Sequence, residues 1–91
     1  MTLALFVVDC AVGGITAERL TEFRRLLRDA ADRVSQRGEA VRYLRCTFIP
    51  EQSRCICLFE ARDLGTVRLV TEIAQFPFGQ IGLAVEFYGI G

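Results

Sequence analysis

Apolar residues recur at helical spacing in one long segment of the first half of the chain. Between Thr16 and Gly38 they fall three and four positions apart, which places them on one face of a helix. Thr16 is a typical helix N-cap and Gly38 a typical C-terminal stop. The apolar stripe consists of Leu20, Phe23, Leu26, Leu27, Ala30, Ala31 and Val34. The pattern predicts an amphipathic helix with a solvated, arginine-rich outer face.

The charged residues of that outer face are spaced so that opposite charges can pair along the helix. Arg25 precedes Asp29 by four positions, and Arg28 precedes Asp32 by the same distance. Because residues four apart are neighbours on a helix surface, we expect both pairs to form.

A second helical pattern, weaker than the first, runs from Asp63 to about Gln75. Asp63 is its expected cap, and Phe76–Gly79 contains the proline that ends it. Its expected buried side chains are Leu64, Val67, Val70 and Ile73.

The remaining apolar runs are short and read as strands. They are Leu3–Val8, Val41–Phe48, Arg54–Glu60 and Ile81–Tyr88. Cys10–Gly14 is expected to be a loop, and the proline-bearing gap 49–53 a hairpin turn. The order β-α-β-β-α-β predicts an α+β, ferredoxin-like fold over residues 1–91 as a single domain. Right-handed crossovers then put both helices on one face of a four-stranded antiparallel sheet.

The first and third of these strands, which are central in that topology, are apolar on both faces. Leu5 and Val7 share one parity, while Phe6 and Val8 share the other. A sheet with one face in water normally alternates apolar and polar residues. A sheet that is apolar on both sides must be covered on both sides, and the chain has no further element for the second. We therefore predict a homodimer in which two sheets face each other in a dimeric α+β barrel-like association.

Composition and charge exclude several classes of function. The chain has 91 residues, 52 % of them hydrophobic, and its 11 basic and 11 acidic residues give a net charge of zero. Without a basic face, a nucleic-acid partner is not expected. No apolar run is long enough for a membrane helix and no signal peptide is evident, so we expect a cytoplasmic protein with reduced cysteines. The absence of histidine excludes the common hydrolytic dyads.

Three cysteines are the first candidate site, for a metal. Cys55 and Cys57, two apart on a strand, point to the same face. A turn about Glu51 and Gln52 would put Cys46 opposite Cys57, and a register shifted by two would put it opposite Cys55. Either way Cys46, Cys55 and Cys57 lie within reach of one another, and a dimer could double their number. Three thiolates suit a soft metal ion. Core packing and redox chemistry are the alternatives, because cysteine is also a common buried residue.

A group of polar residues on the second, third and fourth strands is the second candidate site, for a ligand. Tyr43 and Arg45 are expected to share a face of the second strand, with Glu60 opposite them in the third, and the other members are Glu86 and Tyr88 of the fourth. If they point between two sheets, they line a mostly apolar pocket with a few polar groups, as small-molecule sites do. Tyrosine could donate a proton, arginine hold an anion and glutamate act as a base. The alternative is that the charges face solvent and the tyrosines pack at the rim of the dimer.

Several short phrases along the chain resemble a known family. They are Gly14–Glu18, Val41–Leu44, Cys57–Ala61, Val67–Arg68 and Phe76–Pro77. In pattern and spacing the chain is similar to a family of small ferredoxin-like proteins of mostly unassigned function. Some actinobacterial members of that family are described as nickel-binding or nickel-responsive. The resemblance implies nickel or another soft divalent metal as a possible cofactor.

One departure from the family weakens that implication. The family commonly has a histidine after the Tyr/Trp-Leu pair of the second strand, where this chain has Arg45. A guanidinium has no lone pair to offer a metal. The sequence therefore favours a small homodimer that binds a small apolar ligand or a soft metal between its sheets, without a defined reaction. The alternative is a dimeric α+β barrel enzyme, such as a cyclase, isomerase or cofactor-free monooxygenase, that acts on an apolar aromatic or polyketide-like substrate. A third possibility is a purely structural or protein-interaction module.

Overall fold

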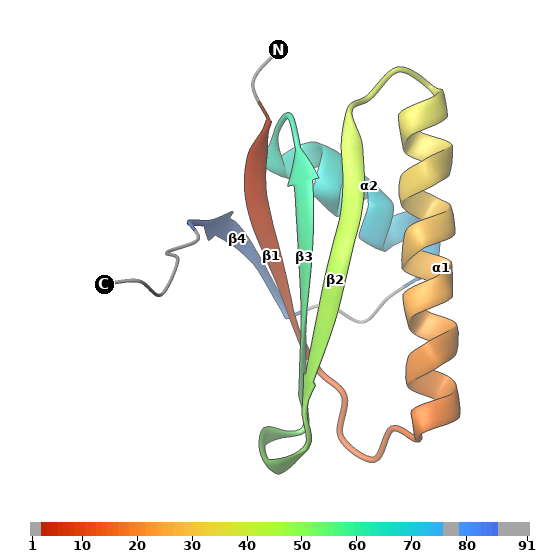
Figure 1. Ribbon diagram of the computed structural model, residues 1–91, viewed down its shortest axis with the longest axis vertical. Helices are drawn as coiled ribbons and strands as arrows, with labels where there is room; N and C mark the ends of the chain where they lie inside the picture. Colours follow the sequence, from red (N-terminus) through yellow and green to blue (C-terminus); the bar gives the residue numbers. More distant parts are fainter. Residues whose placement is uncertain (1–2, 76–78, 86–91) are drawn as a thin grey trace.

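The computed structural model describes residues 3–75 and 79–85, and its elements follow the predicted order β-α-β-β-α-β. Figure 1 shows the sheet in front, α2 behind it and α1 alongside β2. The bounds are β1 Ala4–Ala11, α1 Ala17–Gln36, β2 Val41–Ile49, β3 Arg54–Ala61, α2 Leu64–Ala74 and β4 Gln80–Ala84, with a short 3-10 turn, η1, at Pro50–Gln52. The α+β class, the four-stranded antiparallel sheet and the two helices are confirmed.

Both ends of α1 form as the sequence predicts. The Thr16 hydroxyl accepts a hydrogen bond from the backbone N–H of Arg19 at 3.1 Å, which satisfies one of the unpaired donors of the first turn. Beyond the helix, Gly38 has a φ of +97°, a conformation that L side chains rarely adopt. The residues of the stripe that are buried are Leu27, Ala30, Ala31 and Val34.

The second helix is also capped as predicted. The Asp63 carboxylate accepts hydrogen bonds from the backbone N–H and the hydroxyl of Thr66, both at 2.8 Å, and these bonds lower the pKa of Asp63. Val67 and Val70 are fully buried. Thr71 is buried beside them, which is possible because its hydroxyl donates to the carbonyl of Arg68 at 2.7 Å.

The strands form one sheet in the order β2-β3-β1-β4, and every neighbouring pair is antiparallel. The first and third strands are therefore central. β1 runs three residues further than predicted, to Ala11, so the expectation that Cys10 begins a loop is wrong. The added residues pair with the start of β3, Cys10 opposite Cys55 and Ala11 opposite Arg54. Pairing with β3 therefore continues the strand through Asp9, although this charged residue ends the apolar run from which the strand was predicted.

A bulge in β2 changes which face one predicted site residue occupies. Tyr43 pairs with Phe59, but the next pair is Arg45 with Leu58, so Leu44 is an extra residue in β2. Beyond such a bulge the parity of the strand is reversed. The prediction that Tyr43 and Arg45 share a face is therefore wrong. Tyr43 joins the helix-facing side, and its ring contacts Phe59 edge-on with 5.6 Å between centroids.

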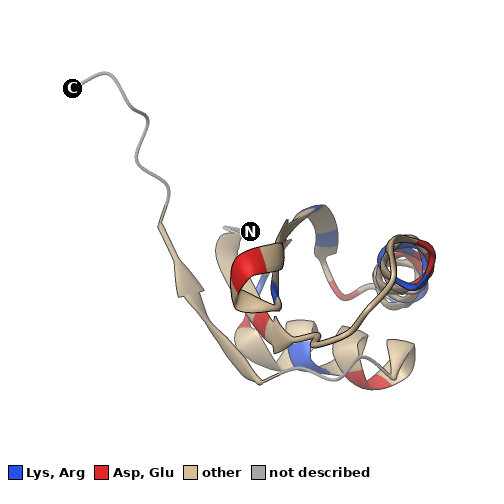
Figure 2. Ribbon diagram, turned by 90° about the horizontal axis from the view of Figure 1, so that it is seen from below, with Lys and Arg blue, Asp and Glu red and all other residues tan. Residues whose placement is uncertain are grey.

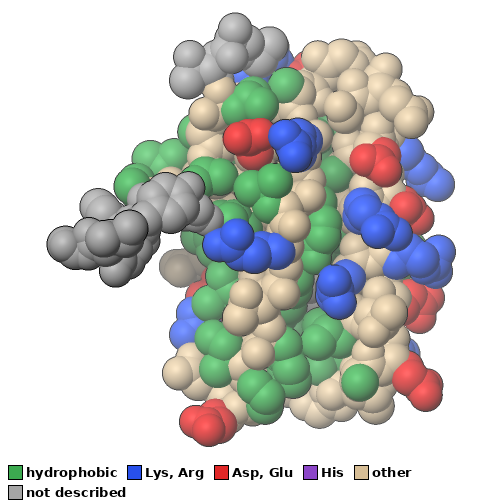
Figure 3. Space-filling model, in the orientation of Figure 1, with side chains coloured by type: hydrophobic (Ala, Val, Ile, Leu, Met, Phe, Trp, Pro, Cys, Tyr) green, Lys and Arg blue, Asp and Glu red, His purple; other side chains and the backbone are tan. Residues whose placement is uncertain are grey.

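The two faces of the sheet have different surroundings. One parity of the central strands packs with residues of both helices in a single core, which includes Phe6, Val8, Cys57 and Phe59. The other parity, with Leu5, Val7, Ile56 and Leu58, forms what we call the open face. Figure 3 looks onto this face, where hydrophobic side chains run along the central strands.

β4 runs away from the helix layer as it extends, which Figure 2 shows from below. Its Leu83 pairs with Phe6 and so belongs to the helix-facing parity, yet 68 % of this side chain is exposed. Within the described residues, no helix is long and apolar enough to cross a membrane.

Candidate functional site

A shallow trough runs along the open face of the sheet, between β2 and β4. Two adjoining hollows of about 440 and 350 Å³ share Val7 and Ile56 and together make up this trough. Its floor is apolar, with Val7, Ile56 and Leu58 from the two central strands. Arg45 and Thr47 of β2 line one side, and residues of β4 line the other. An apolar floor with a few polar groups at its margin is the usual character of a small-molecule site.

An ion pair closes one end of the trough. The guanidinium of Arg54 donates from Nε to one carboxylate oxygen of Asp9 at 3.1 Å and from Nη2 to the other. Both side chains are partly exposed, and a further bond from Arg54 reaches the side chain of Gln52 at 3.0 Å. A bidentate pair of this kind is geometrically rigid. It therefore fixes the polar end of the trough and leaves Asp9 with both oxygens engaged.

The predicted ligand-binding residues are distributed over both faces. Arg45 lines the trough. Glu60 is on the same face but outside the trough, with one carboxylate oxygen 3.6 Å from the guanidinium of Arg42. Tyr43 lies on the opposite side, facing the helices. Glu86 and Tyr88 lie outside the described residues.

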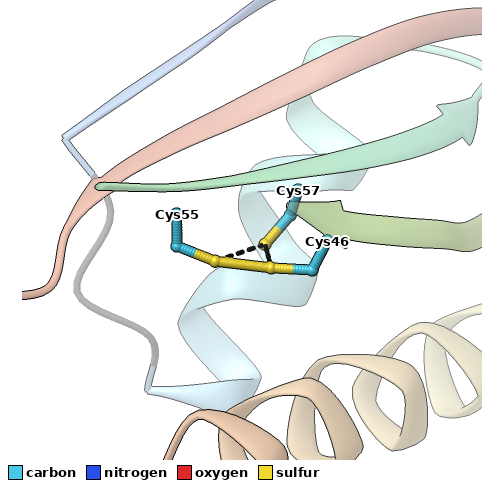
Figure 4. Close-up of side chains that lie close together, drawn as sticks. All are labelled: Cys46, Cys55 and Cys57. Carbon is cyan, nitrogen blue, oxygen red and sulfur yellow. Dashed lines mark hydrogen bonds between the residues drawn. A yellow bond between two sulfur atoms is a disulfide. The ribbon is translucent and has the colours of Figure 1, made fainter. Parts of the chain in front are cut away.

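The predicted cysteine group does come together, and the register is the first of the two alternatives. Cys46 pairs with Cys57 and Phe48 with Cys55. The sulfurs of Cys46, Cys55 and Cys57 all lie within 4.8 Å of one another. Figure 4 shows the three side chains meeting over the helix-facing side of the hairpin. The group is thus separated from the trough by the sheet, and a dimer formed through the open faces would not bring two such groups together.

The oxidation state of the group differs from the expectation of reduced thiols. Cys46 and Cys55 form a disulfide diagonally across the hairpin, with 6.7 Å between their Cα atoms. That separation is within the range that a disulfide spans. Cys57 remains a thiol, with its sulfur 3.0 Å from that of Cys46 and 3.9 Å from that of Cys55.

Burial sets the chemistry of the two thiols. It raises the pKa of Cys57 to about 12, with the neighbouring Cys10 adding to the rise and the positive charge of Arg24 opposing it. Burial, followed by the charge of Asp9, also raises the pKa of Cys10 to about 12, against a hydrogen bond from the backbone of Gly79. Because the thiolate is the reactive form, neither residue is a nucleophile at neutral pH. Cys57 beside the disulfide is therefore poorly suited to thiol exchange.

These thiols should make the protein sensitive to alkaline pH. A cysteine in the unfolded chain ionises near pH 8.5, whereas these two ionise at about 12 in the fold. Their stabilising effect is fully present below pH 8.5. Above it the unfolded chain binds fewer protons, so the free energy of unfolding falls by up to about 1.4 kcal/mol per pH unit for each thiol. Urea unfolding between pH 7 and 10 should show this fall, and it should be much smaller in a variant with Cys10→Ala and Cys57→Ala. Equal slopes in the two proteins would contradict the assignment.

Two features of these sites are not evident from the sequence. The predicted first strand ends before Asp9, and Arg54 is only the first residue of another predicted strand, so their pairing is unexpected. The predicted loop also separates Cys10 from the other cysteines. A signal was present: Val8, Cys10 and Val12 continue the apolar parity of the first strand, and all three are buried.

Fold and site together define a small ferredoxin-like α+β protein with an open, apolar sheet face. No family model matches the chain, and no curated protein matches it either. Among solved structures the chain is similar to SCO4226 from Streptomyces coelicolor A3(2), with a TM-score of 0.73 and 22 % identity. The match covers 93 % of this chain and 100 % of that one. This likeness supports the fold alone.

Proposed function

We propose that the protein is a homodimer that binds a small, largely apolar ligand with an anionic group in the trough, between two facing sheets. The observation that carries the proposal is the apolar floor of Val7, Ile56 and Leu58 on a face that neither helix covers. Burial of this surface by a second copy would release water from it, at about 25 cal/mol for each Å². Arg45 beside the floor supplies a cation for the ligand.

The dimer accounts for features that a monomer leaves unexplained. Val7 and Ile56 in the floor are only partly buried, and Val85 at the margin of the trough is 69 % exposed, although Leu58 is only 9 % exposed. A partner sheet would cover this margin and turn an open trough into an enclosed cavity. The two troughs would then face each other, as in an α+β barrel.

The carboxylates on the open face favour binding over catalysis, because each is already paired with an arginine. An enzyme of the cyclase, isomerase or monooxygenase kind would need a base in the trough. Among the residues that the structure describes there, Asp9 is held at both oxygens by Arg54. Glu60, on the same face, is paired with Arg42. Both carboxylates are thus placed as structural partners of arginine.

A fluorescent probe with the proposed chemistry can test the trough. The probe 8-anilinonaphthalene-1-sulfonate is apolar, aromatic and anionic. We expect saturable binding to the folded dimer, about tenfold weaker in Arg45→Gln because a charge-assisted contact is lost. The matched control is Arg42→Gln, which removes the same charge from the same strand outside the trough and should bind normally. Equal affinity in all three proteins would contradict the proposal.

A second candidate function rests on a separate observation, the convergence of three sulfurs. With the disulfide reduced, Cys46, Cys55 and Cys57 would offer three thiolates within 4.8 Å, a donor set that suits nickel, zinc or another soft divalent ion. In the disulfide form two of these sulfurs are unavailable. We therefore propose that metal binding is confined to the reduced protein.

A further inference from the structure

A different pocket lies on the helix side of the sheet, between α1 and the edge strand β2. It has a volume of about 210 Å³ and is lined by Thr21, Arg24, Arg25, Arg28 and Tyr43. Figure 3 shows basic side chains gathered along α1 where it faces the sheet. We propose that this pocket is an oxyanion site, which binds a phosphate group through Arg24, Arg28 and the hydroxyl of Tyr43.

Two of the arginines that line this pocket carry uncompensated charge. Arg25 has two carboxylate neighbours, with Glu22 and Asp29 each at 4.0 Å. The expected pair of Arg28 with Asp32 does not form, and in the described part of the chain no carboxylate lies within ion-pair distance of Arg24 or Arg28. These two arginines are four residues apart on the helix, where like charges repel. A bound anion would neutralise both.

The hydroxyl of Tyr43 is buried without a well-formed hydrogen bond. Arg24 acts on it as a donor, but no group among the described residues lies in full hydrogen-bonding geometry with its oxygen. Most buried hydroxyls are paired, because an unpaired one loses its bonds to water without replacement. The edge-on contact with Phe59 holds the ring in place, so the hydroxyl is fixed where it is.

These groups converge on one pocket, because Arg24, Arg28 and Tyr43 all line it. Burial raises the pKa of Tyr43, while Arg24, as a hydrogen-bond donor and through its charge, and the charge of Arg28 act to lower it. Arginine donates in a planar fork that suits an oxyanion, and the phenol adds a third direction of donation. A phosphate has enough oxygens to accept from all three. A carboxylate shares the chemistry but has only two oxygens.

Anion titrations test this site in the intact protein. Inorganic phosphate and acetate would be added separately at constant ionic strength, while the Nε–H signals of the arginines are followed by NMR. We expect saturable shifts at Arg24 and Arg28, with phosphate binding more tightly than acetate. Binding should weaken about tenfold or more in Arg24→Gln and in Arg28→Gln, and severalfold in Tyr43→Phe. The control is Arg68→Gln, which removes an exposed arginine from α2 and should leave the affinity unchanged.

The outcomes separate the alternatives. Tighter binding of phosphate assigns a phosphate-bearing ligand, whereas equal binding of acetate supports an oxyanion site for a carboxylate. Failure of both anions to saturate, or a loss in Arg68→Gln as large as in Arg24→Gln, would overturn the proposal. Thermal melting gives an independent check. In anion-free buffer Tyr43→Phe should have a higher Tm than the wild-type protein, and saturating phosphate should reduce this difference in Tm. An unchanged difference would count against the hydroxyl as a donor.

Discussion

Val7→Asp should convert the proposed homodimer into a monomer that is still folded. Val7 lies on the central strand β1, at the junction of the two hollows that form the trough. A partner sheet would enclose a carboxylate at this position without a cation directly opposite it in either neighbouring strand, where Leu58 and Gly82 stand. Enclosing an unpaired charge costs several kcal/mol, and about 1.4 kcal/mol corresponds to a tenfold change in affinity. We expect dimer affinity to fall about 100-fold or more.

Sedimentation velocity over a range of protein concentrations would measure this change. The matched control is Leu69→Asp, which places the same charge at an exposed leucine on α2, in the helix layer away from the open face. This variant should remain a dimer. Circular dichroism should show a native fold in both variants, because neither side chain belongs to the helix-facing core. A dimer that survives Val7→Asp, or a wild-type protein that is monomeric at micromolar concentration, would refute the open face as the interface.

The reduced protein should bind one soft divalent ion per chain, and the oxidised protein none. In the reduced state Cys46, Cys55 and Cys57 can each supply a thiolate, and metal binding releases their protons. Because these protons must be released, affinity should rise with pH. In the oxidised state the disulfide between Cys46 and Cys55 withdraws two of the three ligands. Loss of a ligand should abolish stoichiometric binding.

Native mass spectrometry with added Ni²⁺ or Zn²⁺ can follow each state directly. Cys46→Ser and Cys57→Ser should lose the ion, whereas Cys10→Ala should keep it, since Cys10 lies outside the three-sulfur group. Loss of the ion in Cys10→Ala would instead make this residue a fourth ligand. If the reduced wild-type protein binds neither metal, the three cysteines serve only to pack the core.

Much of the fold was predictable because its signals are local. Thr16 and Asp63 cap the helices through hydrogen bonds to residues three positions along, so a few adjacent residues decide where each helix begins. The hairpin register was also among the alternatives from sequence. The turn between β2 and β3 is short, which limits the pairings open to Cys46.

The candidate sites were harder to predict because they depend on contacts between distant segments. One extra residue, Leu44, is accommodated as a bulge when β2 pairs with β3, and this reverses the parity on which the placement of Tyr43 depended. Asp9 and Arg54 are 45 positions apart and meet only because β1 and β3 are neighbours. The arginine pocket likewise needs α1 to lie beside β2.

By itself, the sequence determined the two amphipathic helices, the order of elements and the presence of apolar residues on both parities of the central strands. These follow from periodicity and capping, which act over a few residues. Tertiary structure alone decided that the cysteines face the helices, that Arg45 lines the trough and that Tyr43 lies on the other side with Arg24 and Arg28. The physical reason is that a side chain's face depends on strand register, and register is set by pairing across the whole sheet.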